Sequence, residues 1–346
     1  MSTAEMYLAG DIGGTKTSMA LMEGQDGKLR FEREQTFKSD DYGSLESIIT
    51  EFLAGCGDRP QLRGACFGVA GAIIDGRCRT TNLPWTEMSE EGLALAAGAP
   101  RVKLLNDLEA MAYGMLFLPP EELVELNPAA NPGPVRGHAV VLAAGTGLGE
   151  AILSWDGERH RPIASEGGHC SFAPQSELEV ELWRYLRTQF HGHVSYERIL
   201  SGPGFLNLFG FLRQTGRYQE SPTLETELAA CSEIGKRNGV ISKLGLAGTD
   251  QLCQATLDLF ASIYGAEAGN LALKCMAMGG VFIGGGIAPK LLKSLQSGTF
   301  LEGFLAKGRF ASILKTLPVR VATNPKTPIL GAGYHIYHAM SAPKNR

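Results

Sequence analysis

The sequence lacks the features that mark a membrane protein, a secreted protein or a nucleic-acid binder. No apolar run approaches the roughly 18 to 20 residues of a membrane span. The first residues, MSTAEMYLAGD, have no basic start followed by an apolar core. The net charge is -4, and the basic residues are scattered rather than gathered into a positive stripe. We therefore expect a cytoplasmic protein that binds neither nucleic acid nor membrane.

Cysteine pairs with the spacing of a disulfide framework or a metal site are also missing. The seven cysteines contain no C-x-x-C pair, and their odd number and wide separation favour reduced thiols over disulfides or structural zinc. They are Cys56, Cys66, Cys78, Cys170, Cys231, Cys253 and Cys275.

The length and the order of the expected elements predict two α/β domains. At 346 residues the chain is too long for one ordinary core. Patterns typical of strands and helices alternate along it. We predict strands at 62–69 and 102–105, a helix at 45–53 capped by Ser44, a helix opened by the capping box of Ser176 and Glu179, and a helical pattern at 251–275 interrupted at Gly265 and Gly269.

Glycine is abundant, with 44 residues, or about twice the average usage. The segment LAGDIGGTKTSMALM has Lys16 and Thr17 at the spacing of a phosphate-binding P-loop, but Thr15 replaces its second glycine. A P-loop also needs a following helix, whereas TSMALM has the pattern of a strand. We therefore expect a hairpin of two strands with Asp11 beside its turn.

Two further glycine-rich turns follow apolar strands. AVVLAAGTGLGEAILSW at 139–155 repeats the first hairpin, and GGVFIGGGIAPK at 279–290 supplies a third turn. A single glycine turn is more often only a tight turn, and GTGLG departs from the dinucleotide fingerprint. Together the three turns predict a nucleotide site, because successive backbone N–H groups form concave anion sites. Thr15 and Thr146 would add hydroxyl donors, and Asp11 would hold Mg²⁺ through water.

These motifs resemble those of a known superfamily. DIGGTKT, GTGLG and GGVFIGGGIAPK, in this order, resemble the two phosphate motifs and the adenosine motif of the actin-like sugar kinases and heat-shock ATPases. LLNDLEAMAYG, SEGGHCSFAPQSELE, HVSYERILSGPG and AGNLALK resemble the ATP-dependent bacterial glucokinase family. The related ROK family carries a zinc-binding cysteine cluster beyond its E-x-G-H motif, where this chain has only Cys170. The resemblance is therefore to the non-ROK branch, although Lys16 after GGT is common among ROK members.

The resemblance implies a fold, an activity and partners. The fold would be two actin-like (ribonuclease H-like) α/β domains, a small one at 1–117 and 323–346 and a large one at 118–322, with the active site in the interdomain cleft. The C-terminal GYHIYHAM would form a helix of the small domain. The activity would be transfer of the ATP γ-phosphoryl group to the 6-hydroxyl of glucose, with Mg²⁺, by a homodimer.

The resemblance also implies site residues. Asp107, just after the strand VKLL, would accept the hydroxyl proton. The motifs ND, EGGH and YER supply the sugar ligands Asn106, Asp107, Glu166, His169 and Glu197. The nucleotide would contact Gly10, Asp11, Ile12, Gly13, Gly14, Thr15, Gly145, Thr146, Gly147, Gly285 and Gly286.

Simpler roles remain open for two of these residues, and other functions remain open for the chain. Asn106 has the position of a helix cap, and Glu197 that of a surface ion-pair partner of Arg198. A kinase for fructose, mannose or an N-acetyl amino sugar would use the same residue types. A sugar sensor or a heat-shock-like ATPase would reuse the fold alone, but a sensor does not require Asp107.

Overall fold

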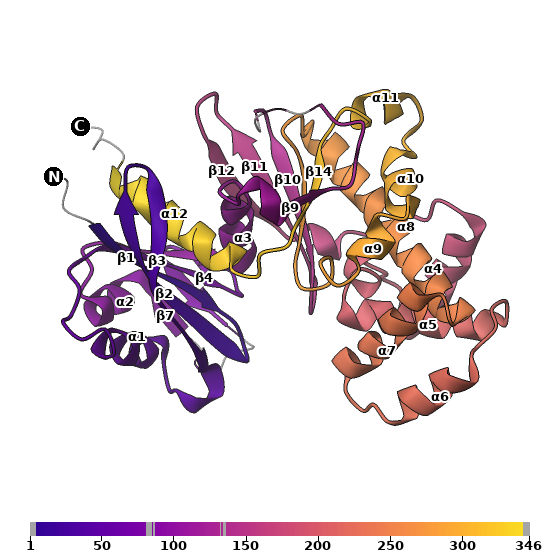
Figure 1. Cartoon of the computed structure of the whole chain (residues 1–346), viewed down its shortest axis with the longest axis horizontal. Coiled ribbons are helices and arrows are strands. Elements are labelled where there is room, and N and C mark those ends of the chain that lie inside the picture. The colour runs from indigo at the N-terminus through magenta and orange to yellow at the C-terminus, as the bar shows by residue number, and fades with distance from the viewer. Residues whose placement is uncertain (1–4, 81–84, 86, 132, 134–135, 342–346) are drawn as a thin grey trace. The chain divides into compact units, whose positions relative to one another are not determined.

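The computed structural model describes residues 5–80, 85, 87–131, 133 and 136–341. These divide into two compact units (Figure 1). The first unit comprises Met1–Pro119, His160–Ala164 and Asn324–Arg346, and the second comprises Pro120–Arg159 and Ser165–Thr323. The domain ranges predicted above differ from these at the boundaries and in the placement of His160–Ala164.

The first unit is built on a mixed sheet with strand order β3-β2-β1-β4-β8. β1 (Glu5–Ile12) and β2 (Lys16–Gln25) form the predicted antiparallel hairpin, β3 (Lys28–Lys38) extends it, and β4 (Leu62–Val69) and β8 (Val102–Asn106) continue the sheet in parallel. The strands predicted at 62–69 and 102–105 are confirmed. A small separate sheet contains β5 (Ile73–Ile74), β6 (Arg77–Arg79) and β7 (Glu87–Ser89).

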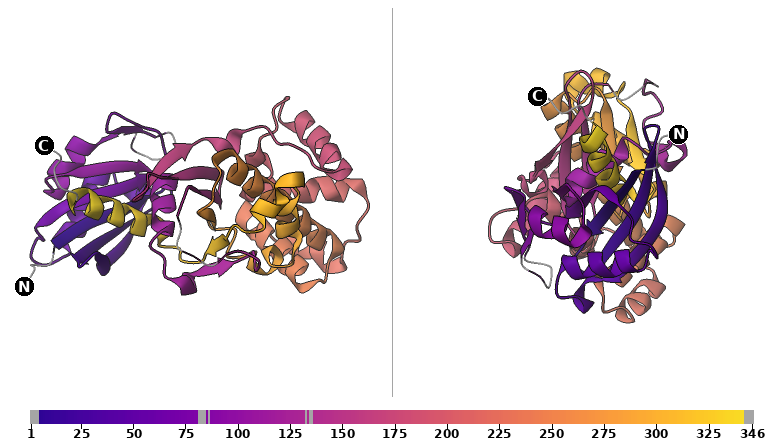
Figure 2. Two further views of the ribbon diagram at one scale, coloured as in Figure 1. Left: turned by 90° about the horizontal axis from the view of Figure 1, so that it is seen from above. Right: turned by 90° about the vertical axis from the view of Figure 1, so that its left-hand side faces the viewer.

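Helices cover both faces of this sheet. Because side chains alternate along a strand, Leu8 and Phe67 pack with α1 (Leu45–Ala54) and α2 (Glu90–Ala97), whereas Tyr7 and Cys66 pack with α3 (Asp107–Met115) and α12 (Thr327–Ser341). Ser44 caps α1 as predicted, since its hydroxyl accepts the Ser47 N–H at 3.2 Å. The C-terminal α12 lies against the N-terminal strands in Figure 1 and in the left view of Figure 2.

α12 begins earlier than predicted and includes the segment ILGAG. A side chain at Gly331 would overlap the Ala110 carbonyl of α3, and one at Gly114 would overlap the Thr327 carbonyl. The backbones of the two helices touch at these positions, where no Cβ would fit. This contact explains why glycines occur inside the helices.

The second unit repeats the hairpin with parallel strands beside it. Its strands run in the order β11-β10-β13-β14-β9. β10 and β11 are antiparallel, while β10, β13 and β14 are parallel. Their bounds are β9 (Leu123–Glu125), β10 (Ala139–Ala144), β11 (Leu148–Trp155), β13 (Gly280–Gly284) and β14 (Val319–Ala322), and β12 (His160–Ser165) falls almost wholly in the ranges of the first unit.

Most helices of the second unit pack around α8 (Gln251–Cys275), whose Tyr264 hydroxyl donates to the Leu142 carbonyl at 3.2 Å. The others are α4 (Glu177–Gln189), α5 (Gly202–Thr215), α6 (Pro222–Ala229), α7 (Ile234–Ala247), α9 (Leu292–Leu295), α10 (Thr299–Leu305) and α11 (Ala311–Leu314). Ser176 caps α4 as predicted, but the Glu179 carboxylate accepts the N–H of Gln175 rather than that of Ser176. The predicted capping box is therefore only half formed.

The predicted interruption of α8 is wrong, because the helix is continuous from Gln251 to Cys275. A Cβ at Gly265 would overlap the Phe300 carbonyl, and one at Gly269 would lie 2.6 Å from the Phe304 carbonyl oxygen. Tertiary packing against α10 thus explains glycines that local helix propensity disfavours.

We expect Gly265→Ala to destabilise the second unit by about 1–3 kcal/mol, because the added methyl overpacks the contact between α8 and α10. Gly239→Ala in α7 is the matched control, since nothing lies within 4 Å of its Cβ position. Helix propensity alone should make that control stabilising by up to about 1 kcal/mol. Denaturant melts of both variants measure the difference. Equal effects would contradict the close-contact explanation.

Candidate active site

The first unit brings two carboxylates together at one sheet edge. Asp11 lies near the end of β1, and Asp107 begins α3 directly after β8. Both strands flank β4 in parallel, so their ends meet beside Gly68. A Cβ at Gly68 would lie 3.6 Å from the Asp107 Cα and 3.9 Å from the Gly10 carbonyl oxygen. The two aspartates are therefore neighbours within one unit, as the motifs predict.

Their electrostatics favour a cation. Burial and the charge of Asp107 raise the pKa of Asp11 to about 6, against the opposing effect of Lys16. Asp11 is thus largely ionised at neutral pH, next to a second acid. Among the described residues, no three acidic, histidine or cysteine side chains form a metal cluster. The two carboxylates are hard oxygen donors of the kind that hold Mg²⁺, an ion that keeps several waters and shares substrate phosphates.

The helix start at Asp107 is tightly organised. The Leu108 N–H is shared between Asn106 Oδ1 at 3.0 Å and Asp107 Oδ1 at 2.9 Å. Asn106 Nδ2 donates to the Gly71 carbonyl at 3.2 Å. Asn106 is thus a helix cap, the alternative left open by the sequence, and its sugar contact stays a prediction. Asp107 gains a fixed orientation from the first turn of α3.

The turn between β1 and β2 is braced by a residue that the sequence motifs did not identify. The Gly13 N–H donates to the Lys16 carbonyl at 3.0 Å, and Ser39 Oγ donates to the Gly13 carbonyl at 2.8 Å. The Ser39 N–H donates to the Thr15 carbonyl at 3.1 Å. Ser39 comes from a distant part of the sequence and carries no motif, so only the fold reveals it.

The second and third glycine-rich turns meet in the second unit. The Ile287 N–H donates to the Ala144 carbonyl at 3.2 Å, and a side chain at Gly285, with φ of +79°, would overlap that carbonyl. The Gly202 N–H at the start of α5 donates to the Gly145 carbonyl at 2.8 Å. Two of the three glycine-rich turns, the second and the third, thus lie together. The N-terminus of α5 lies beside them.

Asn238 of α7 is a second residue of this region that the motifs missed. Its Nδ2 donates to the Gly202 carbonyl at 2.8 Å and so holds the start of α5 against the Gly145 turn. The sequence SGPG, with Ser201 as the N-cap and proline in the first turn, signals that helix start. The position of Asn238 depends on tertiary structure alone.

Three of the predicted sugar ligands gather beside the second glycine-rich turn, where a Cβ at Gly147 would lie 2.5 Å from Glu197 Oε2. The 3₁₀ turns Gly167–His169 and Tyr196–Arg198 lie side by side, because the Tyr196 N–H donates to the Cys170 carbonyl at 3.1 Å. Both turns contact Leu148 at the start of β11. The Leu148 N–H donates to Glu197 Oε2 at 3.0 Å, and a side chain at Gly168 would overlap the Leu148 carbonyl.

The side chains of these turns have different environments. Glu197 is half-buried and accepts a backbone N–H, whereas the Arg198 guanidinium lies 4.2 Å over the Phe190 ring. This geometry favours a site residue over the surface ion pair of Glu197 with Arg198. Glu166 and His169 are exposed, with 3.9 Å between Oε2 and Nε2. Exposed polar groups beside a fixed carboxylate suit a polyhydroxylated ligand.

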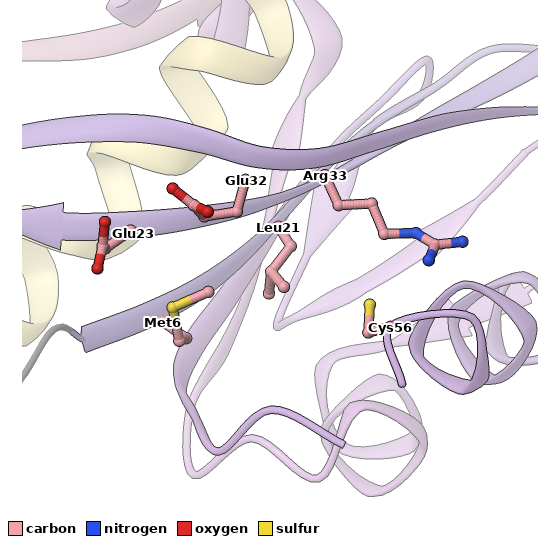
Figure 3. Close-up of a pocket in the computed structure, with 6 residues that line it drawn as sticks. All are labelled: Met6, Leu21, Glu23, Glu32, Arg33 and Cys56. Atoms are coloured by element: carbon pink, nitrogen blue, oxygen red, sulfur yellow. The ribbon is translucent and has the colours of Figure 1, made fainter. Parts of the chain in front are cut away.

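A pocket elsewhere in the first unit contains none of the predicted site residues (Figure 3). Figure 3 shows Glu23 and Glu32 on adjacent strands on one side of it, with Arg33 and Cys56 on the other. Its lining is completed by Met6 and Leu21. Leu21 comes from the segment of the first glycine-rich hairpin, but none of the candidate nucleotide, sugar or catalytic residues lines the pocket.

Comparison with known proteins identifies relatives over nearly the whole chain. The sequence model of the glucokinase family matches residues 8–339. A glucokinase of Synechocystis sp. is 39% identical over 344 residues, covering 94% of this chain and 96% of the relative. The crystal structure of a glucokinase from an Antarctic psychrotroph has a TM-score of 0.84 at 30% identity. The match covers 96% of this chain and 99% of the chain in that structure.

A ROK family glucokinase from Streptomyces griseus, solved with glucose and AMPPNP, has a TM-score of 0.62 at 19% identity. The match covers 95% of this chain and 98% of the chain in that structure. That likeness shows the two-domain actin-like fold alone. The predicted fold class is confirmed. No described helix is both long and apolar enough to cross a bilayer.

Proposed function

This chain belongs to the glucokinase family, and we propose that it transfers the γ-phosphoryl group of ATP to the 6-hydroxyl of glucose, giving glucose 6-phosphate. The observation that carries the proposal is the pairing of Asp11 and Asp107 at one sheet edge, at positions whose motifs resemble those of the family. Cytoplasmic location and a homodimer remain predictions that accompany it.

Asp107 is the proposed general base. Phosphoryl transfer needs mainly positioning and charge neutralisation, so one well-oriented carboxylate near the attacking hydroxyl is enough. Its Oδ1 accepts the Leu108 N–H at 2.9 Å, and the N-terminus of α3 favours its negative charge. The carboxylate would take the hydroxyl proton as the new P–O bond forms and the bond between the γ-phosphorus and the oxygen of the departing ADP breaks.

Asp11 and the glycine-rich turns are the proposed nucleotide site. When bound, Mg²⁺ neutralises charge that develops on the transferring phosphoryl group. Asp11 would hold the ion through water, and the turns at 13–15 and 145–147 would offer N–H groups and the Thr15 and Thr146 hydroxyls to phosphates. The turn of Gly285 and Gly286 would lie against the adenosine.

Asn106, Glu166, His169 and Glu197 are, together with Asp107, the proposed sugar ligands. Carboxylate, amide and imidazole groups match hydroxyls that both donate and accept. The cap formed by Asn106 leaves one amide N–H for a ligand, because Nδ2 has two N–H groups and one donates to Gly71, whereas Oδ1 accepts the N–H groups of Leu108 and Glu109. Capping and sugar binding are therefore compatible roles for this residue.

The first test is a coupled assay of the purified protein with MgATP and a panel of hexoses. We expect glucose to exceed fructose and N-acetylglucosamine by at least about tenfold in kcat/KM, because an analogue that lacks a recognised hydroxyl leaves buried polar groups unpaired. Equal rates across the panel would reject glucose specificity and favour a general hexose kinase. No turnover of any hexose would favour the sensor or ATPase alternatives.

Asp107→Asn should lower kcat by about 10²- to 10⁴-fold while glucose binding persists, because the nearly isosteric amide cannot accept the proton. Steady-state kinetics and calorimetric titration with glucose measure the two effects. Asp41→Asn, an exposed substitution in the same unit, is the control and should leave kcat unchanged. A kcat near that of the wild type in the Asp107 variant would remove this residue from the role.

Glu197→Gln should weaken glucose binding about ten- to a hundredfold, since hydrogen bonds to a charged group contribute roughly 1.5 to 3 kcal/mol. The melting temperature without sugar should stay near that of the wild type, because the amide oxygen still accepts the Leu148 N–H. Glu181→Gln, which breaks a surface ion pair with Arg217, is the control and should leave glucose affinity unchanged. Calorimetry with glucose decides, and an unaltered Kd would exclude Glu197 from the site.

A further inference from the structure

Two buried carboxyl groups of the second unit lie against the proposed sugar-binding segments, and neither is among the predicted site residues. Glu150 on β11 is 1% exposed, and Glu267 on α8 is 0% exposed. A side chain at Gly167, between Glu166 and His169, would overlap the Glu150 carboxylate. Acidic side chains are almost never this buried without a partner, so the pair needs an explanation.

Glu267 connects α8 to the turn that carries Glu197. Its Oε2 accepts from Asn270 Nδ2 at 2.8 Å, and the same Nδ2 donates to the Tyr196 hydroxyl oxygen at 3.0 Å. Burial and the charge of Glu267 raise the pKa of Tyr196, so this hydroxyl keeps its proton. Because Tyr196 directly precedes Glu197, α8 holds the turn through Asn270.

The two carboxyl groups differ in the partners that stabilise a negative charge. Glu267 Oε2 has the donor Asn270, and its Oε1, which has no hydrogen-bond partner among the described residues, lies 3.6 Å from the Lys274 ammonium. Glu150 Oε1 is buried and has no hydrogen-bond partner among the described residues. Burial and the charge of Glu267 raise the pKa of Glu150 to about 7. Glu150 therefore retains its proton to a higher pH than an ordinary glutamate.

We propose that Glu150 and Glu267 are positioning residues of the sugar site: Glu150 supports Gly167, Glu267 holds Tyr196 through Asn270, and together they fix the segments that carry Glu166, His169 and Glu197. The proposal rests on the proposed function, which assigns these segments to glucose. Loss of the Glu150 proton places a buried charge against Gly167, beside the Glu267 carboxyl group. The segment must then shift, and glucose binding weakens as the pH rises.

Other groups near Glu150 also carry charge or titrate. Lys274 opposes the effect of Glu267 and favours the charged form of Glu150, but burial outweighs it. The neighbouring groups are Tyr264, Glu267, Lys274 and Cys275 on α8, Glu166 and His169 beside Gly167, Tyr196 and Glu197 in the adjacent turn, and Lys307, which faces Glu267. All of them remain when Glu150 alone is replaced, so the difference between the pH profiles of the wild type and the Glu150 variant reports on Glu150.

The experiment compares the glucose KM of the wild type and Glu150→Gln from about pH 6 to about pH 9, at saturating MgATP. The wild-type KM should rise about fivefold across this range as Glu150 ionises, whereas the permanently neutral variant should keep the low-pH value throughout. Glu179→Gln removes another buried acid of the same unit and should reproduce the wild-type profile. A wild-type KM that stays flat, or identical profiles for wild type and Glu150→Gln, overturns the proposal.

Tyr196→Phe tests the other half of the arrangement, since it removes the hydroxyl and retains the ring that packs on Phe172. The glucose KM should rise about threefold or more while the ATP KM stays unchanged, because only the turn that carries Glu197 loosens. Tyr185→Phe, a hydroxyl deletion on α4, is the control. Equal glucose KM values in the two variants overturn the role of Glu267. Absence of hexose phosphorylation in the wild type would instead refute the proposed function.

Discussion

Main chain lies directly against main chain at a few glycines, and the geometry of the candidate site depends on these contacts. Gly285 touches Ala144, and Gly168 touches Leu148, so two separate segments lie against the two sides of one hairpin turn. A Cβ at either glycine would force the segments apart, because the contacting atoms belong to backbone that cannot rotate away. The backbone contacts set where the polar groups lie, and the side chains supply the chemistry.

Each unit contains a pair of interacting acids, and their surroundings give the pairs different properties. Asp11 and Asp107 are only partly buried, beside N–H groups of a helix start and a turn, where the proposed Mg²⁺ would relieve their repulsion. Glu150 and Glu267 are fully buried beside Lys274, where desolvation outweighs charge pairing. A proton relieves the repulsion there. The same residue chemistry thus suits the proposed metal in one place and a neutral acid in the other.

The sequence predicted what depends on local pattern. The hairpins, the strands at 62–69 and 102–105, and the caps Ser44 and Ser176 follow from alternation and from side-chain oxygens at helix starts. The family motifs identified Asp11 and Asp107, which the fold brings together. The predicted interruption of α8 was wrong. Gly265 permits close packing of α8 against a neighbouring helix, and local helix propensity carries no information about that contact.

Other features could not be predicted because they arise from residues far apart in the chain. Ser39 braces a turn more than twenty residues before it, and Asn238 holds a helix start on another element. Neither has a motif, since a hydroxyl and an amide are common surface groups. Glu150 lies within a quoted glycine-rich segment, yet its burial depends on α8, which the sequence places more than a hundred residues away.

Helix N-termini stabilise negative charge in both units. In the first, α3 begins at Asp107, so the proposed base is held where the helix dipole favours its ionised form. In the second, α5 begins at Gly202, whose N–H contacts the Gly145 turn, so the dipole of α5 favours an anion beside that turn. Each effect is worth only about 0.3–1 kcal/mol at an exposed site. Because both act on groups that the backbone contacts have already fixed, they add charge stabilisation with little further ordering of the chain.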